Sequence, residues 1–221
     1  MVEIRQLGLT GYLDGLHAQD VAATEVRMRR TTGVLLVTRH PPTVTLGRRA
    51  AMADLHVDRE TRLALGISLF HVDRGGGATF HYPDQAVIYP ILDLERLGLS
   101  VNGLLDRIGA AVLLMLSAHG IRAGWDQERP GAWLSPGQPM AGAKLAAVGL
   151  HLSAGITTHG LAINTGPGGE AFLFIDPCRT PGLAVAAMSD VTGIVPDPDA
   201  VGLAVARDIA ASLGSRGGGT S

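Results

Sequence analysis

The sequence is poor in several residue types, and each shortage excludes a class of protein. Cys178 is the single cysteine among 221 residues, which excludes an intramolecular disulfide and a cysteine-rich metal site. The net charge of −2 lacks the basic excess of a nucleic-acid-binding protein. The apolar runs around 110–116 and 145–152 are too short to cross a bilayer, and the N-terminus lacks the pattern of a signal peptide. We therefore expect a cytoplasmic protein that binds neither nucleic acid nor a membrane.

Lysine is as rare as cysteine. Lys144 is the only lysine, so seventeen of the 18 Lys and Arg residues are arginine. A codon bias toward Ala, Gly and Arg explains this count without any function. The chemical alternative is that arginine cannot release its proton in a protein, whereas lysine can act as a base. Composition alone leaves both explanations open.

What is abundant points to one packed domain. Hydrophobic residues make up 46% and charged residues 17% of the chain, which favours a globular core over disorder. We expect a single domain over 1–213 and a disordered, Gly- and Ser-rich tail over 214–221. Helical and strand patterns are mixed without strict alternation, which predicts an α/β or α+β sheet protein.

The periodicity of apolar residues predicts the individual elements. The clearest helix follows Ser100 as N-cap and ends before Gly120, and a closing helix runs from a cap at Asp199 to about Leu213. Pro90 indicates an edge strand or a bulge. A first helix is expected from Asp14 to about Arg30, and His40–Arg49 reads as a loop. Strands are expected over Glu3–Gly8, Val34–Thr38, Ile67–Val72, Gln85–Leu94, Ala143–Ser153, Leu161–Thr165 and Phe172–Asp176.

Cys178 and Lys144 are the candidates for covalent chemistry. A lone cysteine is more often an inert buried side chain, but Cys178 follows Pro177 where the last predicted strand ends. A nucleophilic thiol needs a neighbouring base or cation. In the predicted strand Ala143–Ser153, Lys144 shares a face with Ala146, Val148, Leu150 and Leu152, because side chains two residues apart point the same way. This predicts an inward-facing amine that can accept a proton. The alternative is a strand that starts after Lys144, whose side chain then reaches solvent.

The glycine-rich segment Arg74–His81 predicts a tight turn beside a ligand, with a plain hairpin as the alternative. It lacks the third glycine and the helix of a dinucleotide site, and Gly142–Leu145 lacks the Ser or Thr of a phosphate-binding loop. His81, His151 and His159 have no metal-ligand spacing, so we expect them to form hydrogen bonds and expect no metal.

Read together, the segments resemble the octanoyltransferases of lipoate biosynthesis. The similar segments occur in the family's order and are His40-Pro-Pro-Thr-Val-Thr-Leu-Gly-Arg48, Arg74-Gly-Gly-Gly-Ala-Thr-Phe-His81, Gly142-Ala-Lys-Leu-Ala-Ala-Val-Gly149, His159-Gly-Leu-Ala-Ile-Asn164 and Pro177-Cys178. The resemblance implies a biotin/lipoate ligase-like fold, with a large mixed sheet, a small sheet, and helices on one side. It also implies Cys178 as the acyl-thioester nucleophile and Lys144 as its proton-transfer partner, with His159 supporting. The implied acyl-binding residues are Arg74, Gly75, Gly76, Gly77, Ala78, Thr79, Phe80, His81, Ala147, Val148, Gly149, Gly160, Leu161 and Ala162.

The implied reaction needs no cofactor. The donor would be octanoyl-acyl carrier protein, and the acceptors would be lipoyl domains of 2-oxoacid dehydrogenases and the glycine cleavage H protein. Asp84 and Arg179 stand where the family usually has glycine, so either is strained if its position needs a positive φ. Two alternatives remain: an ATP-dependent lipoate or biotin ligase, which needs no cysteine, and a catalytically silent acyl-binding protein.

Overall fold

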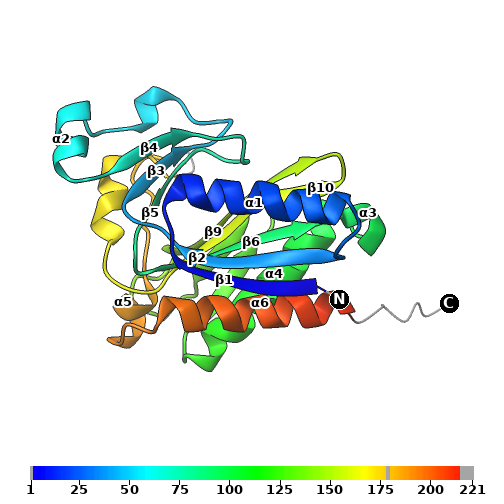
Figure 1. The fold of residues 1–221 in the computed structure, drawn as a ribbon. Helices are drawn as coiled ribbons and strands as arrows, with labels where there is room; N and C mark the ends of the chain where they lie inside the picture. The colour runs from blue at the N-terminus through cyan, green and yellow to red at the C-terminus, as the bar shows by residue number, and fades with distance from the viewer. Residues whose placement is uncertain (1, 178–179, 215–221) are drawn as a thin grey trace.

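The computed structural model describes residues 2–177 and 180–214 as two sheets with helices packed around them (Figure 1). Cys178 and Arg179 lie outside the described residues, as do 215–221 of the predicted tail; Gly214 ends the last helix. The seven-stranded sheet has the order β1 (Val2–Leu9), β2 (Gly33–Arg39), β6 (Gln85–Leu92), β10 (Ile156–Asn164), β9 (Lys144–Ser153), β8 (Gly131–Leu134) and β7 (Ala123–Asp126). The three-stranded sheet has the order β4 (Ser68–His71), β3 (Thr43–Leu46) and β5 (Ala78–His81).

The large sheet is mixed, as predicted, and so is the small one. β1 and β2 are parallel and are joined by α1 (Tyr12–Arg27), whereas the other neighbours in the large sheet are antiparallel. In the small sheet, β3 is parallel to β4 and antiparallel to β5. Besides α1, the described residues form two long helices, α4 (Val101–Ala118) and α6 (Pro198–Gly214). The other helical segments are short: α2 (Arg59–Ala64), α3 (Leu94–Leu97), α5 (Met188–Thr192), η1 (Met52–Asp54) and η2 (Gly169–Phe174).

Helices cover both faces of the large sheet, not one face as expected. On β2, Leu35 and Val37 belong to the main core with α4 (Val101–Ala118) and α6 (Pro198–Gly214). Val34 and Leu36 belong to a second core with α1. Successive side chains of a strand point to opposite faces, so α1 lies across the sheet from α4 and α6 (Figure 1). This accounts for the continuous apolar run in β2, which is buried on both sides.

The helix after Ser100 forms as predicted. The Ser100 side chain accepts a hydrogen bond from the Gly103 N–H at 3.0 Å, and Gly120 has the left-handed φ of +73° typical of a helix end. At 18 residues and a mean hydropathy of 1.4, α4 is long and apolar enough to cross a membrane. The run around 110–116, on which the prediction rested, covers only part of this helix and is too short to do so. The apolar stripe of α4 is buried in the main core, which explains this hydrophobicity.

Three sequence predictions about strands were wrong. β3 lies inside the segment read as a loop, and β5 lies inside the glycine-rich segment. Phe172–Asp176 is no strand, because η2 occupies Gly169–Phe174. Its apolar side chains, including Phe172 and Ile175, pack into the core of the small sheet, so burial alone produced the strand-like pattern.

Pro90 lies inside the large sheet, so of the two alternatives offered for it, an edge strand or a bulge, the edge strand was wrong. β6 pairs with β2 on one side and β10 on the other. The β6–β10 ladder stops at the pair Leu161–Ile88, and the Thr157 hydroxyl donates to the Pro90 carbonyl at 2.5 Å. A central strand tolerates this proline because the neighbouring ladder is interrupted beside it.

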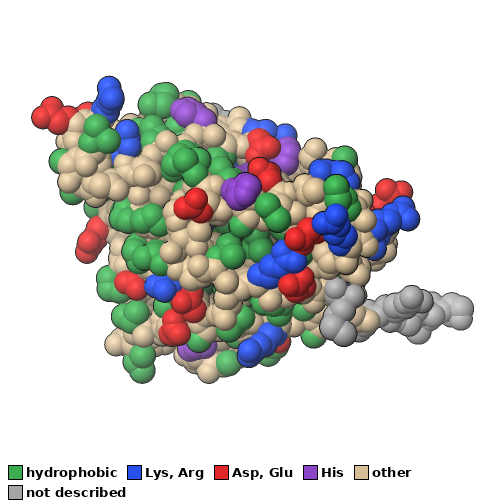
Figure 2. All heavy atoms as spheres, in the orientation of Figure 1, with side chains coloured by type: hydrophobic (Ala, Val, Ile, Leu, Met, Phe, Trp, Pro, Cys, Tyr) green, Lys and Arg blue, Asp and Glu red, His purple; other side chains and the backbone are tan. Residues whose placement is uncertain are grey.

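The cap of the last helix differs from the prediction by two residues. Asp197, not Asp199, accepts a hydrogen bond from a backbone N–H at the start of α6, while Asp199 pairs with Arg39 at 3.1 Å. On the face shown in Figure 2, basic and acidic side chains are interspersed.

Candidate functional site

Lys144 is the first residue of β9 and is only 5% exposed, so the alternative in which it reaches solvent was wrong. The reason given for its burial was also incomplete. The β8–β9 register shifts between Ala132 and Trp133, and both Leu145 and Ala146 belong to the main core. A bulge of this kind breaks the alternation of faces. The Lys144 amine lies 4.9 Å from the centre of the Trp133 ring.

Lys144 borders a narrow cavity that also reaches Pro177. Thr79, Asn164 and Phe172 line the same cavity. Pro177 itself is held beside the small sheet, because it forms a β-bridge with Ala78 of β5. Cys178 lies outside the described residues, but its chain neighbour Pro177 is therefore placed at the same cavity as Lys144.

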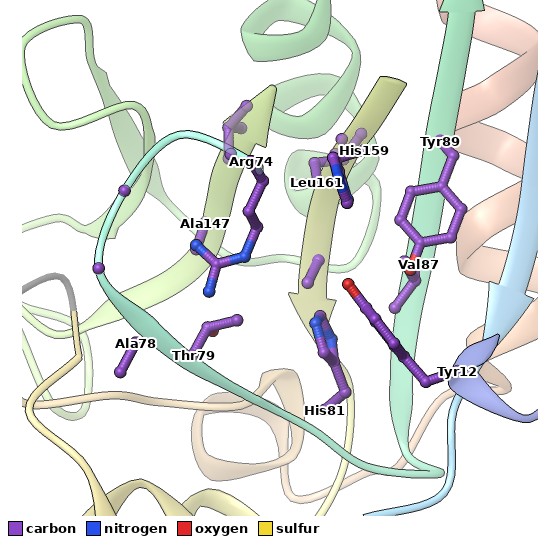
Figure 3. A pocket seen from close by; sticks show the side chains of 16 residues that line it. Tyr12, Arg74, Ala78, Thr79, His81, Val87, Tyr89, Ala147, His159 and Leu161 are labelled. Carbon is purple, nitrogen blue, oxygen red and sulfur yellow. The ribbon is translucent and has the colours of Figure 1, made fainter. Parts of the chain in front are cut away.

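A second, inner cavity continues from the narrow one, since Thr79, Ala147 and Ala162 line both. It runs between the glycine-rich segment and the strands β6, β9 and β10 (Figure 3). Twelve of the fourteen residues expected to bind an acyl chain line it: Arg74, Gly76, Gly77, Ala78, Thr79, His81, Ala147, Val148, Gly149, Gly160, Leu161 and Ala162. The structure thus gathers at one cavity residues that lie far apart in the sequence.

Two predicted residues lie elsewhere. Phe80 points away from the inner cavity and packs with Tyr82 and Phe172 in the core of the small sheet. Gly75 borders an outer cavity that also reaches Lys144, and its N–H donates to the Leu150 carbonyl at 2.9 Å. Alternation along β5 explains the case of Phe80, because its neighbours Thr79 and His81 face the inner cavity.

The glycine-rich segment connects β4 and β5, which lie on either side of β3, so the hairpin alternative was wrong. The segment passes very close to two other strands. A Cβ atom on Gly149 would lie 2.9 Å from the Gly75 carbonyl oxygen, and one on Gly47 would lie 2.6 Å from the Gly76 carbonyl oxygen. The glycines at these positions therefore permit close backbone approach, which forms one wall of the cavity.

Arg74 extends from this segment across the cavity (Figure 3). Its guanidinium donates to the Thr45 carbonyl at 2.7 Å, to the Thr45 hydroxyl at 2.9 Å and to the Gly75 carbonyl at 3.0 Å. At 8% exposure it is buried, and these acceptors fix its orientation. Arg74 therefore holds the small sheet and the glycine-rich segment together at the cavity wall.

His81 lies opposite Arg74, next to Tyr12 (Figure 3). Gln85 donates through Nε2 to Asn164 Oδ1 and the Phe80 carbonyl, so its Oε1 is the acceptor for His81 Nδ1 at 2.8 Å. Burial lowers the pKa of His81 from its ordinary 6.5 to about 3, helped by nearby His40 and Arg74. The ring is therefore neutral, with its proton on Nδ1 and a lone pair on Nε2.

His159 separates the inner cavity from a shallow outer depression beside Asp73. The His159 ring atom Nε2 lies 2.8 Å from Asp73 Oδ1, and the His159 backbone N–H donates to Gln19 Oε1 at 2.7 Å. Burial lowers the pKa of His159 despite the Asp73 carboxylate. His159 has a φ of +56°, which is rare outside glycine, so several contacts hold an unfavourable backbone in place. Asp84, where we considered strain, has no positive φ; Arg179 lies outside the described residues.

Sequence reasoning missed the wall of the inner cavity formed by Tyr12, Val87 and Tyr89. The Tyr89 hydroxyl lies 2.7 Å from His40 Nε2, while His40 Nδ1 donates to the Thr10 carbonyl at 2.7 Å. Burial lowers the pKa of His40 and raises that of Tyr89. Two tyrosines and a valine thus add an aromatic wall to a cavity that Arg74, Thr79, His81 and His159 also line. A tyrosine at a helix start or inside a strand carries no local signal for this role.

Comparison with known proteins decides the family. The model of the lipoyl protein ligase A/B catalytic domain matches residues 11–208. An octanoyltransferase of Polynucleobacter necessarius is 36% identical over 214 residues, covering 95% of this chain and 97% of the relative. The chain belongs to the octanoyltransferase family. A mitochondrial octanoyltransferase of Arabidopsis thaliana is 33% identical, over 80% of this chain and 73% of its own.

The fold prediction is confirmed by solved structures. A bipartite lipoate protein ligase of Thermoplasma acidophilum superposes with a TM-score of 0.68 at 17% identity, covering 96% of this chain and 84% of that chain. At such low identity the likeness concerns the fold alone, which is that of the lipoate and biotin ligases.

Proposed function

We propose that this octanoyltransferase-family protein moves an octanoyl group from the thioester of acyl carrier protein to the target lysine of a lipoyl domain. The single observation that carries the proposal is the placement of buried Lys144 and Pro177, the neighbour of Cys178, at a cavity continuous with the inner one. The names of its relatives support the acyl group and the connection to lipoate biosynthesis. The acceptors would be the lipoyl domains of 2-oxoacid dehydrogenases and the glycine cleavage H protein, in the cytoplasm.

The first half-reaction loads the enzyme. Lys144 accepts the proton of the Cys178 thiol, and the thiolate attacks the carbonyl carbon of the donor thioester. The bond between that carbon and the donor sulfur then breaks, and Lys144 returns the proton to the leaving thiolate. The product is octanoyl-Cys178, whose alkyl chain lies in the inner cavity between the glycine-rich segment and β10.

The second half-reaction transfers the octanoyl group from Cys178 to the acceptor. The amine of the target lysine attacks the thioester carbon, Lys144 accepts a proton from this amine, and the Cys178 thiolate leaves. That proton returns to Cys178, so an amide forms and the free thiol is restored. Neither half-reaction consumes ATP, because the donor thioester is already activated.

Intact mass measurement tests the covalent step. The protein incubated with octanoyl-acyl carrier protein alone should gain one octanoyl group, which hydroxylamine removes and Cys178→Ser abolishes. Equal acylation of Cys178→Ser would refute the thioester mechanism. Product formed from free octanoate and ATP, with none from the carrier-bound donor, would favour a ligase. A protein that binds octanoate but turns over neither donor would be the silent acyl-binding alternative.

Substitution of Lys144 tests the proton transfer. Lys144→Arg keeps a positive charge beside the thiol but cannot accept its proton, because a guanidinium stays protonated. We expect Cys178 of this variant to react with iodoacetamide at nearly the wild-type rate while acyl transfer falls by about 100-fold. Lys144→Ala should lose both properties. If Lys144→Arg transfers acyl groups at the wild-type rate, the amine is not the proton acceptor.

A further inference from the structure

The outer cavity is the second of the two cavities that Lys144 borders. Its volume is about 540 Å³, compared with about 60 Å³ for the inner cavity and about 20 Å³ for the narrow one. It shares Lys144 and Leu183 with the narrow cavity, and Gly76, Gly77, Val148 and Gly149 with the inner one. Lys144 therefore joins the narrow and the outer cavity, and the glycine-rich segment Arg74–His81 borders all three.

The lining of the outer cavity carries an excess of positive charge. Arg49, Arg129 and Lys144 border it, while Glu128 is the acidic residue among its described lining. The Arg129 guanidinium pairs through Nε with Asp126 Oδ2 at 2.8 Å and lies 4.3 Å from the centre of the Trp133 ring. The Lys144 amine lies 4.9 Å from the same ring centre. Trp133 thus spans the distance between the buried amine and the exposed arginine. The cavity therefore has the buried Lys144 amine at one place and exposed guanidinium groups at another. This arrangement favours an extended ligand with an anionic end.

The backbone of Arg49 is held against the cavity wall. The Arg49 N–H donates to the Gly76 carbonyl at 3.1 Å, and Gly76 itself borders both the inner and the outer cavity. Its side chain is exposed, so it can meet a ligand without first breaking a buried contact. The backbone of Arg49, from which this side chain extends, is therefore tied to the segment that forms the acyl cavity.

We propose that the outer cavity holds the thiol-bearing arm of the acyl donor, and that Arg49 and Arg129 bind the phosphodiester of that arm. The inference rests on the proposed function. A thioester extends in two directions from its carbonyl carbon. If the alkyl chain fills the inner cavity and the carbon lies at Lys144, the sulfur-linked arm continues into the outer cavity. Guanidinium groups match phosphate oxygens in charge and in geometry.

Arg48 provides a matched control. It is adjacent to Arg49 and equally exposed, but it borders the separate depression formed with Leu16, His71 and Asp73. Arg48→Glu therefore makes the same change in net charge, one residue away, without touching the outer cavity. A general effect of charge on the approach of an acidic carrier protein would appear in both variants.

The first experiment measures binding and needs no turnover. Phosphopantetheine and pantetheine, which differ by one phosphate, are titrated into the protein in a calorimeter under reducing conditions. We expect wild type and Arg48→Glu to bind the phosphorylated form about tenfold more tightly, and Arg49→Glu and Arg129→Glu to lose this difference. Equal affinity of the wild type for the two compounds would overturn the inference, even if the protein transfers octanoyl groups normally.

The second experiment measures KM with three octanoyl donors: the carrier protein, phosphopantetheine and N-acetylcysteamine, which has no phosphate. Arg49→Glu and Arg129→Glu should raise KM for the first two about tenfold and leave it unchanged for the third. A rise for the carrier protein alone would mean that the arginines contact its surface and not the phosphate. A rise in KM for the lipoyl domain alone would assign the cavity to the acceptor. Preserved phosphopantetheine binding without transfer from any donor would refute the proposed function alone.

Discussion

Acid should destabilise this protein through His81, and the structure sets the size of the effect. The ring is buried and neutral, with a pKa near 3 in place of the ordinary 6.5. As the pH falls below 6.5, the unfolded chain takes up a proton at this position and the folded chain does not. Stability is therefore lost progressively between pH 6.5 and about 3. At pH 5, which is 1.5 units below 6.5, His81 alone should cost about 2 kcal/mol.

Urea unfolding of wild type and His81→Asn at pH 7 and pH 5 measures this effect. The asparagine amide can replace Nδ1–H as donor to Gln85, but it does not titrate. Burial also lowers the pKa of His40 and His159, which adds acid sensitivity of the same sign to both proteins. The difference between the two proteins isolates His81. Wild type should lose about 2 kcal/mol more than the variant between the two pH values; equal losses would show that His81 is not held neutral.

Two further substitutions test the packing and the capping. In Gly160→Ala, the new Cβ would lie 2.0 Å from the Ile88 carbonyl oxygen, so urea unfolding should show a loss of about 1–3 kcal/mol; Gly124→Ala, where nothing lies within 4 Å, should be nearly neutral. Equal effects of the two would contradict the close approach of β10 to β6. Ser100→Ala removes the acceptor for the Gly103 N–H and should cost about 1 kcal/mol in the same assay; an unchanged midpoint would mean that the cap contributes nothing.

The sequence alone determined the elements with long periodic patterns and the identity of the candidate site. The α4 stripe with Ser100 and Gly120 needed no tertiary information, because capping and periodicity are local properties. Lys144 and twelve of the residues around the inner cavity were identified because they lie in contiguous motifs. A contiguous motif can be recognised from the order of its residues, whichever residues the fold brings near it.

Tertiary structure alone decided which side chains face the cavity. The bulge at Ala132 and Trp133 set the direction of Lys144 against simple alternation, and a bulge depends on the partner strand. Tyr12 reaches the cavity only because α1 packs across the large sheet from α4 and α6. The central strand β6 tolerates Pro90 because its ladder with β10 stops at the pair Leu161–Ile88. In each case the deciding contact joins residues far apart in the chain, which no local pattern encodes.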